Sequence, residues 1–165
     1  VTVESEPGRG STFRVFLPLS EEELRPQTGQ EFQTPETAGS GTILLVEDEE
    51  MVRDVAAAML TRLSFTVLEA KDGVEAVELF RQHQDEIRCV LCDLTMPRMN
   101  GWETLTALRN LAPDIPVILA SGYDKAQVMA GDHPELPQVF LGKPYKLRGL
   151  SDAISQAIGQ EQGKM

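Results

Sequence analysis

The chain has 165 residues, of which 41% are hydrophobic and 25% are charged, as is ordinary for a globular protein. Its 26 acidic and 15 basic residues give a net charge of −11, which disfavours binding of the whole chain to nucleic acid and suits a divalent cation. Two cysteines make no disulfide framework, and no apolar run approaches the roughly 18 residues of a membrane span. We therefore expect one globular domain with additional segments, no secretory leader and an origin within a longer protein.

Residues 1–19 alternate apolar and polar side chains on either side of a Pro-Gly turn. Val1 and Val3 lie two residues apart before the turn, and the apolar side chains after it, beginning with Phe13, have the same spacing. This period predicts two strands joined as a hairpin. Residues 20–41 have no periodicity and little apolar content, which predicts a flexible linker.

From residue 42 onward, short apolar runs alternate with segments of helical spacing. The predicted strands lie at 43–46, 66–68, 89–92, 117–120 and 139–141, and the first is a continuous apolar run typical of a strand covered on both faces. The segments of helical spacing lie at 51–63, 72–80, 101–111, 125–130 and 147–158. Five strand-helix repeats predict an α/β fold with a parallel five-stranded sheet and helices on both of its faces.

Polar side chains follow four of the predicted strands. Glu47 and Asp48 follow the first strand, and Asp93 follows the third. Ser121 follows the fourth strand, and Lys143 follows the fifth. Because ligands of open parallel sheets bind outside the carboxyl ends of the strands, we expect these five side chains to converge on one edge.

The chemistry of this set points to phosphoryl transfer. Clustered carboxylates need a proton or a cation, and Mg²⁺ prefers oxygen ligands, so Asp48 and Asp93 could bind it directly and Glu47 through water. A carboxylate beside Mg²⁺ can attack phosphorus and form an acyl phosphate. Lys143 and the Ser121 hydroxyl would then stabilise the charge on the phosphoryl oxygens. The sequence therefore predicts phosphorylation of an aspartate.

The same residues resemble the receiver domain of two-component signalling. Four motifs carry the resemblance in order: LLVEDEE, LCDLTMPRMNG, ILASGY and FLGKPY. The resemblance implies a flavodoxin-like (βα)5 three-layer sandwich over residues 42–160, followed by a tail at 161–165. It implies that Asp93 accepts a phosphoryl group from a phosphohistidine, and that the Thr95 backbone carbonyl joins the carboxylates in holding Mg²⁺.

Further roles follow from the resemblance alone. It implies that Ser121 and Lys143 contact the phosphoryl group and change position on activation. Phe140 matches the switch aromatic, whose ring is expected to rotate inward in the active state. Thr95 and Tyr123 match positions that tune how long the phosphate survives.

The hairpin carries a second resemblance. Residues 1–19 are similar to the last two strands of the histidine-kinase ATP-binding domain, and GRGSTF looks like its final glycine-rich box. A linker and a receiver after these strands imply the C-terminal end of a hybrid sensor histidine kinase. We expect a histidine-kinase or histidine phosphotransfer domain as partner and a cytoplasmic location, with no nucleic acid and no membrane contact by this chain, whether or not its parent is membrane-anchored.

Whether the chain is an enzyme stays open, because the phosphorylatable-histidine helix and most of the ATP-binding domain are missing from it. One alternative is a phosphorylation-independent interaction module of the same fold. Another is an aspartyl-phosphate phosphatase, although Thr95 stands where such enzymes typically place a second acid. A transcription factor is disfavoured, since residues 159–165 are too few for a DNA-binding domain.

Four other residues are expected to have no role in chemistry. Cys89 and Cys92 have C-x-x-C spacing, but residues three apart on a strand point to opposite faces, so we expect two buried small hydrophobes. His83 and His133 show no metal-ligand spacing and are expected to be solvated.

Overall fold

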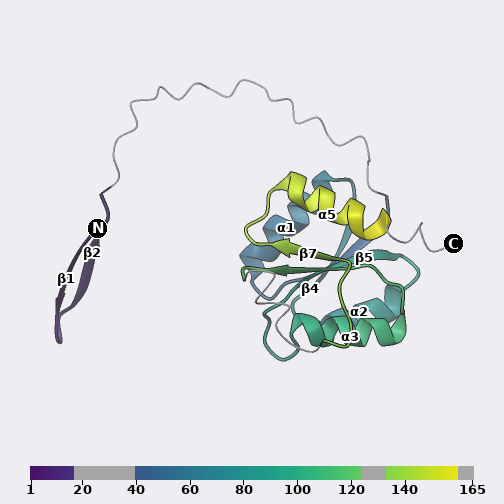
Figure 1. The fold of residues 1–165 in the computed structure, drawn as a ribbon, viewed down its shortest axis with the longest axis horizontal. Helices are drawn as coiled ribbons and strands as arrows, with labels where there is room; N and C mark the ends of the chain where they lie inside the picture. Colours follow the sequence, from purple (N-terminus) through teal and green to yellow (C-terminus); the bar gives the residue numbers. More distant parts are fainter. Residues whose placement is uncertain (17–39, 124–132, 160–165) are drawn as a thin grey trace, which may run out of the picture. The chain divides into compact units, whose positions relative to one another are not determined.

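The structure is a computed structural model that describes residues 1–16, 40–123 and 133–159 (Figure 1). The predicted helix at 125–130, the tail at 161–165 and nearly all of the predicted linker lie outside the described residues. The chain forms two units, the first with the hairpin and the second with the α/β fold, and each is described by itself.

The first unit is the predicted hairpin. Its strands β1 (Thr2–Glu6) and β2 (Gly10–Arg14) pair antiparallel, with Val3 opposite Phe13. Gly8 has a φ of +80° in the connecting turn, a conformation that glycine adopts without steric cost. The side chains of Val3 and Phe13 are exposed.

The second unit is built on a five-stranded sheet. Its strands are β3 (Thr42–Val46), β4 (Thr66–Ala70), β5 (Ile87–Asp93), β6 (Val117–Ser121) and β7 (Val139–Gly142). All neighbouring strands pair parallel, in the order β4-β3-β5-β6-β7. The sheet confirms the predicted strands, and its central strands β3, β5 and β6 are almost entirely buried, as their continuous apolar runs require.

Helices cover both faces of this sheet. The described helices are α1 (Glu50–Arg62), α2 (Gly73–His83), α3 (Gly101–Leu111) and α5 (Leu147–Gly159). Helices α1 and α5 lie on one face and α2 and α3 on the other (Figure 1). Each face has its own hydrophobic cluster, one around Leu60 and Ile154 and the other around Phe80 and Leu105. The three-layer arrangement is therefore the flavodoxin-like fold expected from the sequence. Within the described residues, no helix is long and apolar enough to cross a membrane.

The two cysteines fall on opposite faces of the sheet. Cys89 belongs to the cluster beneath α1 and α5, and Cys92 belongs to the cluster beneath α2 and α3. Both are buried and free, and burial raises the pKa of the Cys92 thiol far above its ordinary value. Their placement confirms the interpretation as small buried hydrophobes.

Helix α3 begins immediately beside the end of β5. Asn100 caps the helix, because its side chain accepts the backbone N–H of Glu103 while the Glu103 carboxylate accepts the N–H of Asn100. Gly101 follows, and a Cβ there would lie 2.6 Å from the Asp93 carbonyl oxygen and 2.8 Å from Leu94 Cα. Only glycine allows this close approach, which sets the loop between Asp93 and α3.

Candidate functional site

Three carboxylates meet at the carboxyl edge of the sheet. Glu47 follows β3 and Asp93 ends β5, and these strands are neighbours. Single oxygens of Glu47, Asp48 and Asp93 lie within 4.8 Å of one another. Glu47 and Asp93 are only 5% and 8% exposed, while Asp48 is exposed. The structure thus brings together the three carboxylates that the sequence placed at strand ends.

Lys143 bridges two of these carboxylates from the end of β7. Its Nζ lies 2.6 Å from Glu47 Oε2 and 2.6 Å from Asp93 Oδ1. Burial alone would lower the pKa of Lys143, but hydrogen bonds to Asp93 and Glu47 outweigh it and raise the pKa above its ordinary value. Burial raises the pKa of Glu47, and the contact with Lys143 offsets only part of this effect. The site therefore holds an ammonium group charged between two buried acids.

The Thr95 backbone N–H and the Arg53 side chain contact residues of this cluster. The Thr95 N–H donates to Asp93 Oδ2 at 3.1 Å, so both Asp93 oxygens have a partner. Arg53 of α1 donates to the Glu47 carbonyl oxygen at 2.8 Å and pairs with the Glu69 carboxylate at 3.5 Å. No motif in the sequence singles out Arg53, although its position in the first turn of the helix after the acidic pair is a signal for it.

Ser121 ends β6 beside this cluster. Asp93 pairs with Ala120 in the sheet, so Ser121 lies one residue farther along the neighbouring strand. Its side-chain oxygen accepts the N–H of Tyr123 at 3.0 Å, and its carbonyl accepts the N–H of Lys143 at 2.7 Å. Ser121 is 5% exposed, whereas Tyr123 is exposed. The hydroxyl thus lies at the same edge while capping the chain that follows it.

Phe140 on β7 is half-buried and belongs to a set of aromatic contacts. Its ring packs edge-on against Trp102 of α3, with 5.7 Å between centroids and 62° between planes. The His133 ring stacks on Trp102, with 3.7 Å between the ring centroids and 6° between the ring planes. The expectation of a solvated His133 is wrong, because the flat indole offers the imidazole an apolar surface and the ring nitrogen Nε2 is buried.

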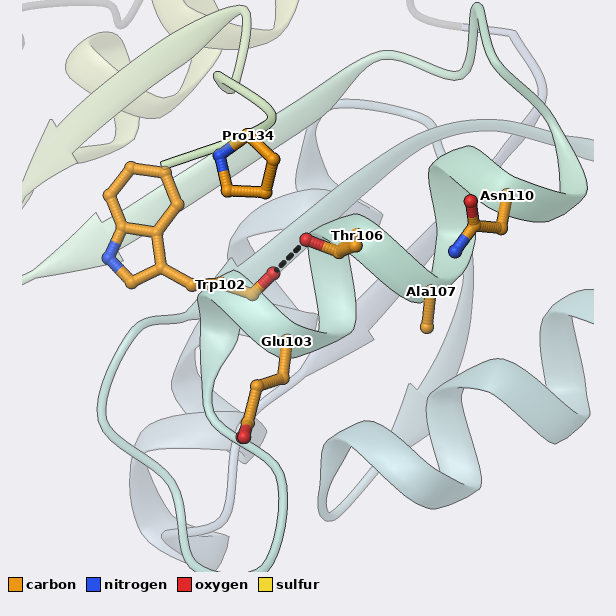
Figure 2. A pocket seen from close by; sticks show the side chains of 6 residues that line it. All are labelled: Trp102, Glu103, Thr106, Ala107, Asn110 and Pro134. Carbon is orange, nitrogen blue, oxygen red and sulfur yellow. Dashed lines mark hydrogen bonds between the residues drawn. The ribbon is translucent and has the colours of Figure 1, made fainter. Parts of the chain in front are cut away.

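Beside this indole, α3 carries a shallow hollow of about 390 Å³ (Figure 2). It is lined by Trp102, Glu103, Thr106, Ala107, Asn110 and Pro134. None of the sheet-edge carboxylates lines it, so the hollow is separate from the acidic site.

The acidic cluster has the composition of a site for a hard cation. Its candidate ligands are all oxygens, and two of the three carboxylates are buried. Burial raises the pKa of Glu47 because it disfavours the charged carboxylate. A divalent cation beside it would stabilise that charge. Glu47, Asp48 and Asp93 therefore fit an ion with the oxygen preference of Mg²⁺.

Comparison with known proteins gives this arrangement a family. Residues 43–155 match the model of the response regulator receiver domain. The chain therefore belongs to the receiver-domain family of two-component signalling. The four motifs of the sequence lie within the matched span, and the family accounts for the observed fold.

Individual relatives extend the comparison beyond this domain. Sensor kinase CckA of Brucella abortus (strain 2308) is 35% identical over 165 residues, which cover 96% of this chain and 18% of that protein. The chain thus spans about a fifth of that relative's length. The crystal structure of the receiver domain from hybrid histidine kinase CckA is 33% identical with a TM-score of 0.60, covering 72% of this chain and 99% of that one.

A third comparison concerns a metal. The receiver domain of sensor histidine kinase PA1611 from Pseudomonas aeruginosa PAO1 was crystallised with a magnesium ion coordinated in its active-site cleft. It is 25% identical with a TM-score of 0.63, covering 73% of this chain and 99% of that one.

Proposed function

We propose that this chain is a phosphoacceptor in a two-component phosphorelay, with Asp93 as the residue that takes the phosphoryl group from a phosphohistidine. One observation carries the proposal. Asp93 lies at the carboxyl edge of the sheet, within one cluster with Glu47 and Asp48, and its Oδ1 contacts Lys143. This arrangement supplies a nucleophile, a cation site and a fixed positive charge in one place.

The transfer is a substitution at phosphorus. An Asp93 carboxylate oxygen forms the new P–O bond while the P–N bond of the donor phosphohistidine breaks. The bonding electron pair returns to the imidazole nitrogen, which the solvent can protonate. Lys143, already 2.6 Å from Asp93 Oδ1, stays close to the transferred group and stabilises its oxygens. Ser121 offers its hydroxyl to the same group from the neighbouring strand.

The proposal assigns Mg²⁺ to the carboxylate cluster. Asp48, Asp93 and the Thr95 carbonyl would hold the ion directly, with Glu47 acting through water. When bound, Mg²⁺ supplies positive charge that offsets repulsion between the carboxylate and the phosphoryl oxygens. The oxygen ligand set supports this assignment, as does the magnesium ion in the PA1611 receiver.

We assign the response to phosphorylation to Ser121 and Phe140. A phosphoryl group on Asp93 would draw the Ser121 hydroxyl away from the Tyr123 N–H and shift the population of Phe140 ring positions inward. The half-buried ring of Phe140 is compatible with such a change. By the family resemblance, Thr95 and Tyr123, whose side chains are exposed, would tune how long the phosphate survives.

The parent protein and its partner are also proposals. Similarity to CckA over 96% of the chain supports an origin in a hybrid sensor histidine kinase. Residues 1–19 would then complete an ATP-binding domain, residues 20–41 would be the linker and residues 42–160 the receiver. The partner would be a histidine-kinase or histidine phosphotransfer domain in the cytoplasm, and the net charge of −11 makes nucleic acid an unfavourable ligand.

Intact-mass measurement tests the proposed reaction. With acetyl phosphate and Mg²⁺, the purified chain should gain about 80 Da, the mass of one phosphoryl group replacing a proton. The gain should disappear in Asp93→Asn and when Mg²⁺ is chelated. The exposed Asp114→Asn serves as a control that keeps the gain. A gain that persists in Asp93→Asn would refute the assignment of the acceptor.

A further inference from the structure

We propose that the ion pair between Arg98 and Asp72 is a positioning device for the metal site, holding the loop of residues 94–100 so that the Thr95 carbonyl faces the cation. The inference rests on the proposed Mg²⁺-dependent function. It adds two residues that contact neither the cation nor the phosphoryl group. The family resemblance assigns no role to either of them.

Asp72 presents a buried carboxylate at the start of α2. It is 1% exposed, and its Oδ1 accepts the backbone N–H groups of Val74 and Glu75 at 2.9 and 3.0 Å. These bonds cap the helix and use one oxygen. The other oxygen, Oδ2, forms an ion pair with a guanidinium nitrogen of Arg98. Since an unpaired buried charge is strongly unfavourable, the carboxylate gives Arg98 a well-defined docking point.

Arg98 has an unusual backbone conformation. Its φ is +68°, in the left-handed region that residues other than glycine rarely adopt. The side chain is 60% exposed, so its own burial does not explain the conformation. The Met99 N–H donates to the Pro97 carbonyl across this residue, a tight turn that accompanies the positive φ, and the ion pair with Asp72 fixes the side chain that the turn presents.

The anchored residue belongs to the loop that serves the site. Gly101 donates its N–H to the Leu94 carbonyl at 2.9 Å, closing the loop at its base, and Met99 donates to the Pro97 carbonyl at 2.8 Å. Thr95, at the near side of the loop, donates its N–H to Asp93 Oδ2. These hydrogen bonds close the base of the loop and tie its near side to the sheet, whereas the Arg98 ion pair ties its far side to the start of α2.

The start of α2 already packs against this loop. A Cβ at Gly73, the residue after Asp72, would lie 2.7 Å from Met99 Cγ. Arg98 and Met99, three and four residues beyond Thr95, therefore both hold the loop against the start of α2. Because Mg²⁺ demands near-ideal octahedral geometry, loss of this tie would let the Thr95 carbonyl drift and weaken binding of the ion.

Calorimetric titration with Mg²⁺ tests the inference on the full chain. We expect Arg98→Gly and Asp72→Asn each to weaken Mg²⁺ affinity about threefold to tenfold. The double variant should be no weaker than the worse single variant, since both changes remove the same tie. Glycine is chosen because it accepts the positive φ, and asparagine because it retains an oxygen for the cap.

Two further variants sharpen the result. Arg98→Lys keeps the positive charge and should recover part of the affinity. Arg81→Gln on the exposed surface of α2 removes one charge without touching the ion pair and should bind Mg²⁺ as the wild type does. Denaturant unfolding of each variant separates affinity from stability, and Arg98→Gly decides the question if Asp72→Asn does not fold.

The possible outcomes distinguish failure of this inference from failure of the proposed function. If folded Arg98→Gly binds Mg²⁺ within twofold of the wild type, the ion pair is only a structural contact and the inference is overturned, while the phosphoacceptor function stands. If the wild type itself neither binds Mg²⁺ nor gains a phosphoryl group, the proposed function fails and the inference falls with it.

Discussion

Glu47 is a carboxylate whose burial opposes its own charge. It is 5% exposed, and this burial raises its pKa although Lys143 lies 2.6 Å away. A hydrophobic residue would suit the same position better for folding alone. In a site that receives a cation, the negative charge of Glu47 would attract the ion, even though that buried charge is unfavourable when no ion is bound.

This cost predicts a pH-dependent effect of Glu47→Gln in the absence of Mg²⁺. Because the folded-state pKa lies above the ordinary value of 4.5, the folded protein binds the proton more tightly than the unfolded chain. Glu47 therefore contributes less to the free energy of unfolding as pH rises from 4.5 through the raised pKa. Relative to the wild type, the Gln variant should gain stability over that window.

Urea unfolding in a chelator, at several pH values from acid to neutral, measures this difference. The same substitution at the exposed Glu50 is the matched control and should show no such trend. A stability difference for Glu47→Gln that stays constant with pH, or that falls as pH rises, would contradict the electrostatic account.

At the scale of elements, the sequence predicts much of the site because parallel strands end at one edge. The apolar runs predict β3, β5, β6 and β7, and the residues after each run therefore fall at the same edge of the sheet. Tertiary contacts between distant segments had no such signal. The ion pair of Arg98 with Asp72 and the stacking of His133 on Trp102 depend on how a loop meets a helix, which periodicity does not encode.

Gly101 shows how closely the elements approach at the site. Replacing it with alanine would put a Cβ against the Asp93 carbonyl, a backbone atom with little freedom to move. We expect Gly101→Ala to lower the free energy of unfolding by about 1–3 kcal/mol. Gly149→Ala in α5 is the control, because nothing lies within 4 Å of its Cβ and alanine favours helix. Equal effects of both substitutions on chemical denaturation would refute the packing argument.

Trp102 is the only tryptophan, which makes the aromatic contacts observable. If phosphorylation moves Phe140, the edge-on contact at 5.7 Å must change, and the emission of Trp102 should change with it. We expect a shift in fluorescence when acetyl phosphate is added with Mg²⁺, and none in Asp93→Asn. Unchanged emission from a chain that is fully phosphorylated by mass would argue against Phe140 as the switch.

At the scale of the molecule, both hydrophobic clusters are built from residues after Thr42. The apolar side chains Val3 and Phe13 of the hairpin are exposed, and an isolated two-stranded hairpin is marginally stable in water. These observations favour a receiver that folds independently of residues 1–39.

Deletion of residues 1–39 tests this independence. The shortened chain should unfold within about 0.5 kcal/mol of the full chain and bind Mg²⁺ with the same affinity. Denaturant unfolding and calorimetric titration of the two chains side by side measure both quantities. A large loss of stability would mean that the receiver extends beyond the proposed boundary at residue 42.

The central claim of the account is that Asp93 carries the phosphoryl group, and its most direct test locates the modified residue. Borohydride reduces an acyl phosphate to an alcohol, so a phosphorylated aspartate becomes homoserine. After treatment with acetyl phosphate, Mg²⁺ and borohydride, tandem mass spectrometry of the peptides should find homoserine at position 93. Homoserine at position 48, or no reduced residue in a chain that has gained phosphoryl mass, would contradict the claim.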